Sequence, residues 1–273
     1  MHDNNKLYHK YQMTCLNEKQ QQALNYISQK AKQESQNALN DNGRLMIRAK
    51  NLKISKETLV LILNYIRDEV PLIIHIHVPE TLKLLTTDTH YRNQFETKTS
   101  GGILDNSSRR KWENIIFNNA YANSDSFDRC KYGCIDMNYK KKKNYSAAKQ
   151  YGDSYLVLKS HVRTRTTCCY GDSAGHIAFG QKLEIGTLDN FAHILAKFTD
   201  DELMDIVSII NDLPYVQNHE RYFKELQFHG PIVIDNDIEM LVLNEHHRLS
   251  QEVTKLSDAF KSRGIKVIYS NIF

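Results

Sequence analysis

The sequence predicts an α+β fold in which an N-terminal helical portion, residues 1–70, precedes a β-rich portion, residues 71–273. Three observations support this prediction. With 273 residues, of which 41% are hydrophobic, the chain is long enough to bury a large core. Runs of β-branched residues, such as 72–78, alternate with amphipathic stretches, such as 200–213. No internal repeat or linker-like stretch interrupts this pattern, which favours one α+β domain with the N-terminal helices attached.

The N-terminal portion carries clear helix signals. Apolar residues recur at helical spacing within 17–39, which predicts a surface helix. Ser55 is a good N-cap for a second, more apolar helix. Pro71 separates that helix from the run 72–78, which is the first predicted strand.

The stretch Thr89–Gly102 consists almost entirely of hydrogen-bonding and aromatic side chains. Its first half alternates weakly and its second half ends in a Gly-Gly turn, so it is predicted to be a short strand that leads into a loop. On such a strand Arg92, Gln94 and Glu96 share one face. A cation, an amide and a carboxylate would then point into one cleft, where the turn lets a ligand approach the backbone.

The later segments are assigned in the same way. Residues 154–159 and 161–170 alternate and are β-rich, so they are predicted to pair as a hairpin. A late strand places Glu225, Gln227 and His229 on one face. The other predicted elements are helices over 106–121, 187–198, 200–213, 235–243 and 250–261, and strands over 129–136 and 265–269.

Composition argues against several classes of protein. A net charge of +4 with 25% charged residues is too weak to indicate a nucleic-acid partner. No apolar run of about 18 residues and no signal peptide occurs, so no membrane partner is expected, and a cytoplasmic location is predicted unless a specialised system secretes the protein. Five cysteines without regular spacing favour reduced thiols.

Two single features have ordinary structural explanations. The basic loop Lys140–Lys143 is predicted to be solvated, and Trp112 is predicted to anchor packing.

Short motifs are spread along the chain. They are Tyr91-Arg-Asn-Gln-Phe-Glu-Thr97 with Ser100-Gly-Gly102, Trp112-Glu113, Tyr132-Gly133, Arg165-Thr-Thr167, Gly171-Asp-Ser173 and Glu225-x-Gln-x-His-Gly-Pro231. Together they resemble a bacterial family described as a domain of unknown function, which looks like a divergent branch of the ADP-ribosyltransferases. The resemblance covers roughly Leu72 to the end. The order of the motifs departs from the usual arrangement in ADP-ribosyltransferases, in which a Gln-x-Glu or Glu-x-Glu motif comes late. Here the Gln-x-Glu pair comes early, at Gln94 and Glu96, and the late motif is Glu225-Leu-Gln227.

The resemblance implies an ADP-ribosyltransferase-like mixed β-sheet core in residues 71–273. It implies that NAD is a substrate, that ADP-ribose is transferred to a protein side chain, an arginine, and that nicotinamide is released. The implied acceptor is host NAD-dependent glutamate dehydrogenase, and the implied setting is a secreted bacterial effector that acts as a virulence toxin in the host cytoplasm. No Gly-x-Gly-x-x-Gly motif occurs, so NAD would be consumed and not held as a redox carrier, and no metal is expected.

The chemistry of this reaction explains the residue types. Breaking the nicotinamide glycosidic bond develops positive charge on the ribose, which a carboxylate near the 2′-hydroxyl stabilises. Arg92 suits the pyrophosphate because a guanidinium bonds two oxygens, and Tyr91 or Tyr132 offers a ring for the nicotinamide. The candidate catalytic residues are Glu225, Glu96 and Arg92. The candidate NAD-binding residues are His77, Tyr91, Arg92, Gln94, Thr97, Ser100, Gly101, Tyr132, Arg165, Thr166, Thr167, Gln227 and His229.

Two other functions stay open at this point. His75 and His77 share one face of their predicted strand, a spacing that occurs in metal sites. A metal-dependent hydrolase would use them together with a later histidine, which is His161, His176 or His229. The third possibility is a noncatalytic module whose basic loop docks on a partner.

Overall fold

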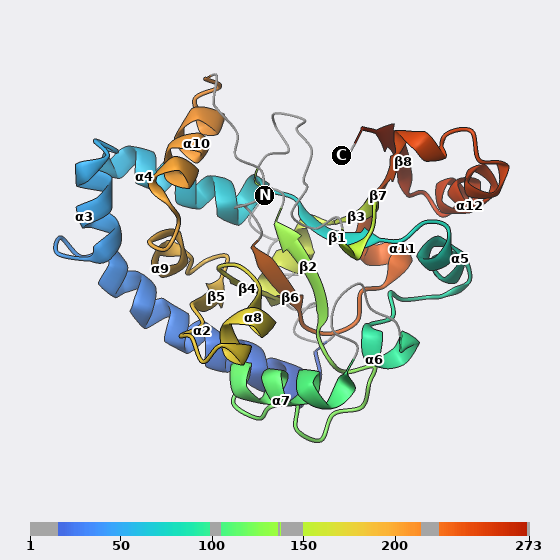
Figure 1. Cartoon of the computed structure of the whole chain (residues 1–273), viewed down its shortest axis with the longest axis horizontal. Coiled ribbons are helices and arrows are strands. Elements are labelled where there is room, and N and C mark those ends of the chain that lie inside the picture. The colour runs from blue at the N-terminus through green and yellow to red at the C-terminus, as the bar shows by residue number, and fades with distance from the viewer. Residues whose placement is uncertain (1–15, 99–104, 136, 138–149, 214–223, 272–273) are drawn as a thin grey trace, which may run out of the picture.

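A mixed eight-stranded β-sheet forms the centre of the computed structural model, which describes residues 16–98, 105–135, 137, 150–213 and 224–271. The strands are β1 Leu72–Ile76, β2 Lys131–Ile135, β3 Ser154–Leu158, β4 Thr166–Cys169, β5 Ile185–Thr187, β6 Glu225–Phe228, β7 Ile238–Asn244 and β8 Lys266–Ser270. Their order is β5-β4-β6-β2-β1-β3-β7-β8 (Figure 1). Neighbours pair antiparallel except β7 and β8, which are parallel. The α+β class predicted from the sequence is confirmed.

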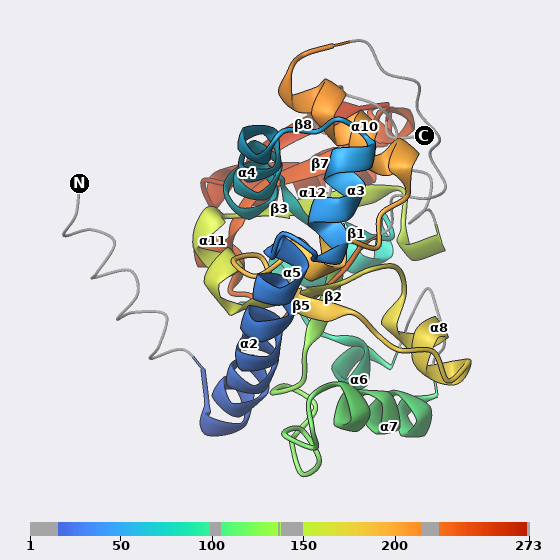
Figure 2. The same ribbon diagram turned by 90° about the vertical axis from the view of Figure 1, so that its left-hand side faces the viewer.

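Helices of very different length surround the sheet. They are α2 Glu18–Leu39, α3 Arg44–Asn51, α4 Lys56–Asn64, the π-helix η1 Tyr65–Glu69, α5 Glu80–Thr87, α6 Gln94–Thr97, α7 Asn106–Ile116, the 3-10 helix η4 Ser160–Arg165, α8 Ser173–Ala178, α9 Ala192–Leu195, α10 Asp200–Ile210, α11 Ile234–Asp237, the 3-10 helix η6 Glu245–His247 and α12 Gln251–Ser262. In Figure 2, α2 rises along one side of the molecule towards α3. Its Ala23 and Ile27 join a buried cluster with Cys169 and Ile185 of the sheet, so the N-terminal helices pack on the β-rich portion.

The two faces of the sheet differ in chemistry. Tyr132 lies opposite Gln227 and Cys134 lies opposite Glu225 in the β2–β6 pair, and antiparallel partners point to the same side. These four side chains therefore share one face. Leu226 points to the other face, where it belongs to the main hydrophobic core together with apolar residues of α4, α9, α10 and α12.

Most predicted elements lie where the local signals placed them. The helices α2, α4, α7, α10 and α12 and the strands β1, β2, β3 and β8 are confirmed. Ser55 and Ser250 accept the backbone N–H groups of Thr58 and Val253 and cap their helices as expected.

The structure corrects several predictions about local structure. β3 and β4 do not form a hairpin, because η4 intervenes and the two strands pair with different neighbours. The helix predicted over 187–198 begins only at Ala192, since Thr187 ends β5. The helix predicted over 235–243 is a single turn, α11, followed by β7 between β3 and β8. Pairing with two neighbouring strands overrides the local signal there.

Two further expectations concern a membrane-spanning helix and the basic loop. Within the described part of the chain, no helix is both long and apolar enough to cross a membrane. The basic loop Lys140–Lys143 lies outside the described residues.

Candidate functional site

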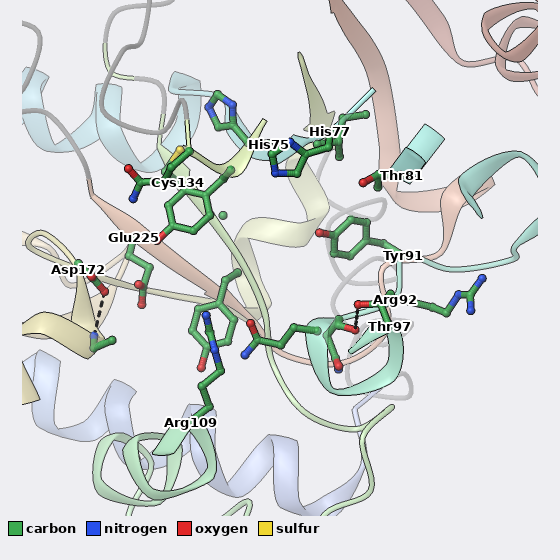
Figure 3. A pocket seen from close by; sticks show the side chains of 18 of the residues that line it. His75, His77, Thr81, Tyr91, Arg92, Thr97, Arg109, Cys134, Asp172 and Glu225 are labelled. Carbon is green, nitrogen blue, oxygen red and sulfur yellow. Dashed lines mark hydrogen bonds between the residues drawn. The ribbon is translucent and has the colours of Figure 1, made fainter. Parts of the chain in front are cut away.

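A cavity of about 460 Å³ lies on the polar face of the sheet (Figure 3). β1, β2 and β6 contribute its floor, and α5, α6, α7 and the start of α8 contribute its walls. Sites for small molecules span roughly 300–1,000 Å³, so the cavity has a suitable size. Its lining includes His75, His77, Thr81, Tyr91, Arg92, Gln94, Thr97, Arg109, Trp112, Tyr132, Gly133, Cys134, Tyr151, Asp172, Ser173 and Glu225.

Glu225 lies at one end of the cavity, beside Asp172 (Figure 3). It is 7% exposed. Ser173 Oγ donates to its Oε1 at 2.5 Å, and Gln227 Nε2 donates to the same oxygen at 2.7 Å. Burial, assisted by the charge of Asp172 and opposed by these two hydrogen bonds, raises the pKa of Glu225 from 4.5 to about 7. A carboxylate tuned in this way within a cavity is typical of a catalytic group.

A chain of hydrogen bonds orients the amide that holds Glu225. Thr167 Oγ1 donates to Gln227 Oε1 at 2.8 Å, so the amide nitrogen must face the carboxylate. His229 Nε2 lies 3.2 Å from Thr167 Oγ1, and the Tyr121 hydroxyl lies 2.7 Å from His229 Nδ1. Burial lowers the pKa of His229 to about 3, so the neutral ring donates to Thr167 and accepts from Tyr121. Thr167, Gln227 and His229 therefore support Glu225 from behind and do not line the cavity, in contrast to the predicted binding role.

The segment around Arg92 is not a strand. It leads into the helical turn α6, and Asn93 Oδ1 accepts two backbone N–H groups of that turn. Glu96 Oε2 accepts the backbone N–H of Asn93 at 3.0 Å, which completes a capping box. Residues two apart on a helical turn point in different directions, so the predicted common face of Arg92, Gln94 and Glu96 is wrong.

The three side chains consequently have different environments. Glu96 Oε1 lies 3.2 Å from His90 Nε2, and Glu96 is not part of the cavity lining. Arg92 lines the cavity, but its guanidinium binds both oxygens of Asp88 at 2.6 and 3.1 Å and points away from the middle (Figure 3). Gln94 also lines the cavity, and among the described residues its buried Nε2 has no hydrogen-bond partner. This amide offers a donor to a ligand.

α7 supplies a guanidinium that the sequence analysis did not identify, that of Arg109. Arg109, Trp112 and Ile116 lie three and four residues apart, so they share one face of the helix, and all three line the cavity. Arg109 reaches from α7 towards the cavity in Figure 3. Trp112, predicted to anchor packing, is half-buried and lines the cavity. The helical spacing was a signal for this face, but the charged run at residues 109–111 also fits an exposed surface.

The floor of the cavity is fixed by the Tyr132-Gly133 pair. Tyr132 donates its hydroxyl to Glu113 Oε1 at 3.0 Å, and Glu113 forms a buried ion pair with Arg129. Burial raises the pKa of Glu113, and it raises the pKa of Tyr132 well above its ordinary value, so the phenol stays protonated. A side chain at residue 133 would place its Cβ 2.2 Å from the Ile73 carbonyl oxygen, so this position requires glycine.

The histidines proposed for a metal-dependent hydrolase do not come together. His75 and His77 line the cavity, and burial lowers the pKa of His75 to about 4. None of the three later histidines lines the cavity. His161 Nε2 is 2.7 Å from Asp237 Oδ1, His176 Nε2 is 2.9 Å from the Tyr170 carbonyl oxygen, and His229 belongs to the hydrogen-bond chain behind the cavity. In the described part of the molecule, the clusters whose ligand atoms are close enough to hold an ion include none of these histidines.

The remaining predicted residues divide into three groups. Arg165 is buried against Asp237, and Thr166 donates its hydroxyl to a backbone carbonyl, so both stabilise the start of β4 outside the cavity. Ser100 and Gly101 lie outside the described residues. The predicted residues that do line the cavity are Glu225, His77, Tyr91, Arg92, Gln94, Thr97 and Tyr132.

Comparison with known families adds one result. Residues 76–211 match the sequence model of a family described as "Protein of unknown function (DUF3626)". The matched segment runs from the end of β1 to just past α10, so it contains Arg109, Tyr132 and Ser173, whereas Glu225 lies beyond it. No curated protein matches the chain.

Proposed function

We propose that this protein is a mono-ADP-ribosyltransferase with an ADP-ribosyltransferase-like core, which transfers ADP-ribose from NAD to an arginine of a protein and releases nicotinamide. One observation carries the proposal: Glu225 is a buried carboxylate with a pKa of about 7, held by two donors at the end of a cavity lined with aromatic and cationic groups. The motif resemblance supports the same activity, with host glutamate dehydrogenase as the acceptor and a secreted bacterial effector as the setting.

Glu225 stabilises charge in the proposed reaction. The bond between ribose C1′ and the nicotinamide nitrogen breaks, and nicotinamide leaves with the bonding electrons. The positive charge that develops on the ribose is stabilised by the ionised carboxylate beside the 2′-hydroxyl. An arginine nitrogen of the acceptor then bonds to C1′ and releases one proton.

Other lining residues suit the rest of the dinucleotide. Arg109 replaces Arg92 as the candidate for the pyrophosphate, since Arg109 reaches from α7 towards the cavity, whereas the guanidinium of Arg92 binds Asp88 and points away from the middle (Figure 3). The ring of Tyr132 suits stacking on the nicotinamide. Burial raises the pKa of Tyr91 to about 12, so its hydroxyl keeps its proton and can donate to a ligand oxygen.

Transfer of label tests the proposal. The wild-type protein is incubated with purified glutamate dehydrogenase, or with host-cell lysate, and with NAD labelled in its adenosine. We expect a labelled protein band and release of nicotinamide in equal amount. NAD labelled in its nicotinamide is the matched control and must leave no label on protein. Absence of a labelled band across several lysates, together with no NAD binding by calorimetry, would refute the proposal.

A further inference from the structure

A second cluster of chemically active side chains lies where the end of β7 meets the start of β3. Asp153 Oδ2 is 3.0 Å from His246 Nε2 and 2.8 Å from His247 Nε2. The three atoms all lie within 4.8 Å of one another. Distances of this size are compatible with three ligands around one ion, because metal–nitrogen and metal–oxygen bonds of about 2.0–2.2 Å place tetrahedral ligands a little over 3 Å apart.

Neighbouring groups fix the orientation of this cluster. Asn244 Oδ1 accepts the backbone N–H of His246 at 3.3 Å, so the atom at that position must be the amide oxygen. The same oxygen lies 2.8 Å from His246 Nδ1, which must therefore carry a proton. The lone pair of the neutral ring is then on Nε2, which faces Asp153. Ser154 Oγ donates to the other oxygen of Asp153 at 3.1 Å. Partners of this kind accompany the ligands of metal sites.

The two imidazoles lie against one carboxylate oxygen, because both Nε2 atoms face Asp153 Oδ2 and the ring centroids are only 4.0 Å apart. We propose that Asp153, His246 and His247 bind a divalent transition-metal ion of the zinc class. Two imidazoles among three ligands favour zinc over magnesium or calcium, which prefer oxygen. His246 has a side chain that is 60% exposed, which leaves room for water as a fourth ligand.

The other cluster with suitable ligands makes a useful contrast. Glu34, Glu184 and His193 are equally close together. Glu184 Oε1, however, is 3.3 Å from Lys182 Nζ and 3.1 Å from Lys197 Nζ, and Lys182 Nζ is also 3.6 Å from Glu34 Oε1, so two ammonium groups already balance the two carboxylates. No cation is needed there.

The metal site lies next to the wall of the cavity. Tyr151 lines the cavity, and the carbonyl of Gly152 lies 3.1 Å from His75 Nδ1, a second lining residue. An ion bound to Asp153 would tie this segment to the end of β7. We therefore assign the ion a supporting role in the shape of the cavity and no part in ADP-ribose transfer.

Metal titration of the purified full-length protein tests the inference without relying on any activity. After dialysis against a chelator, Zn²⁺ is titrated by calorimetry and Co²⁺ by visible absorption. We expect one ion per chain, a tetrahedral Co²⁺ spectrum, and a higher thermal unfolding midpoint with Zn²⁺. Asp153→Asn and His247→Gln should each weaken binding by at least about tenfold. His176→Ala removes an imidazole outside the cluster and should bind like the wild type.

Two results would overturn the metal site. One is the absence of stoichiometric binding by the wild type, and the other is equal affinity in the wild type and both ligand variants. Either would make the cluster an ordinary ion pair. Unfolding curves measured in chelator check that both variants are folded, and the two substitutions act on different elements, so one suffices if the other fails to fold.

Discussion

Two short segments, Arg92–Glu96 and Glu225–His229, carry the same sequence pattern, in which a polar side chain stands at every second position. Their structures differ. The later segment is largely the strand β6, whose first residue, Glu225, reaches the cavity while the next two polar residues continue into the supporting hydrogen-bond chain. The earlier segment leads into the turn α6, where the carboxylate of Glu96 caps the helix.

The difference shows that alternation defines a common face only where a strand has partners. β6 pairs with β2 on one side and β4 on the other, which keeps its backbone extended. Beside α6 there is an isolated bridge between His90 and Val233. A polar segment with so little pairing satisfies its backbone groups locally by side-chain capping. We therefore assign Glu225 to chemistry and Glu96 to stability.

The largest expected effect comes from Glu225→Gln. This substitution keeps the shape of the side chain but removes the charge that stabilises the transition state. We expect kcat for ADP-ribose transfer to fall by roughly two to four orders of magnitude, with little change in NAD affinity. Steady-state kinetics and calorimetry measure the two quantities. Full turnover by Glu225→Gln, combined with an inactive but folded and NAD-binding Glu96→Gln variant, would reverse the assignment.

The same variant tests the raised pKa of Glu225 through its effect on stability. The folded chain keeps the Glu225 proton up to about pH 7, whereas the ordinary pKa is 4.5. The stability that this proton contributes is fully present below pH 4.5 and is lost as the pH rises through about 7, a difference of roughly 3 kcal/mol. Glu225→Gln should therefore gain about 3 kcal/mol relative to the wild type between about pH 4.5 and 8 in urea unfolding. A stability difference between the variant and the wild type that does not change with pH would mean that Glu225 ionises as it does in water.

A smaller effect separates the two arginines. Arg109→Lys keeps the charge and removes the bidentate guanidinium, so NAD binding should weaken by about 1.5–3 kcal/mol. Arg92→Lys is the matched control, and it should change the affinity little because Asp88 already occupies that guanidinium. Calorimetry with NAD compares both variants. A larger loss of NAD affinity in Arg92→Lys than in Arg109→Lys would make Arg92 the residue that binds the pyrophosphate.

The smallest effect concerns the helix cap. Glu96→Ala removes the acceptor for the Asn93 N–H and should lower the free energy of unfolding by about 1 kcal/mol. Turnover should stay within about twofold of the wild type, because the residue does not line the cavity. Urea unfolding and kinetics on the same preparation measure both. A folded, NAD-binding variant without activity would show that Glu96 takes part in the reaction.

Local signals account for what the sequence could predict. The caps at Ser55 and Ser250 and the β-branched run in β1 depend on neighbouring residues, and all are confirmed. The strand β7 was predicted as a helix because its conformation depends on β3 and β8, which are distant in sequence. Asn93 and Glu96 have the spacing of a capping box, but the weak alternation of the same residues also fits a strand.

The candidate site was harder to predict than the fold. A strand pattern says which face a residue occupies and not how far it lies from a cavity, so Thr167 and Gln227 were placed in contact with NAD although they support Glu225. Arg109 was missed because a charged residue on an amphipathic helix is usually solvated. Neither point can be decided without the tertiary arrangement.

The proposed function requires the carboxylate of Glu225 to face the nicotinamide ribose of NAD. A crystal structure of the Glu225→Gln variant with NAD, in which turnover is too slow to consume the ligand, tests it most directly. We expect the dinucleotide in the cavity, with the ribose 2′-hydroxyl about 3 Å from the side chain of residue 225. NAD bound elsewhere on the protein, or a cavity without NAD at saturating concentration, would show that Glu225 does not act on NAD.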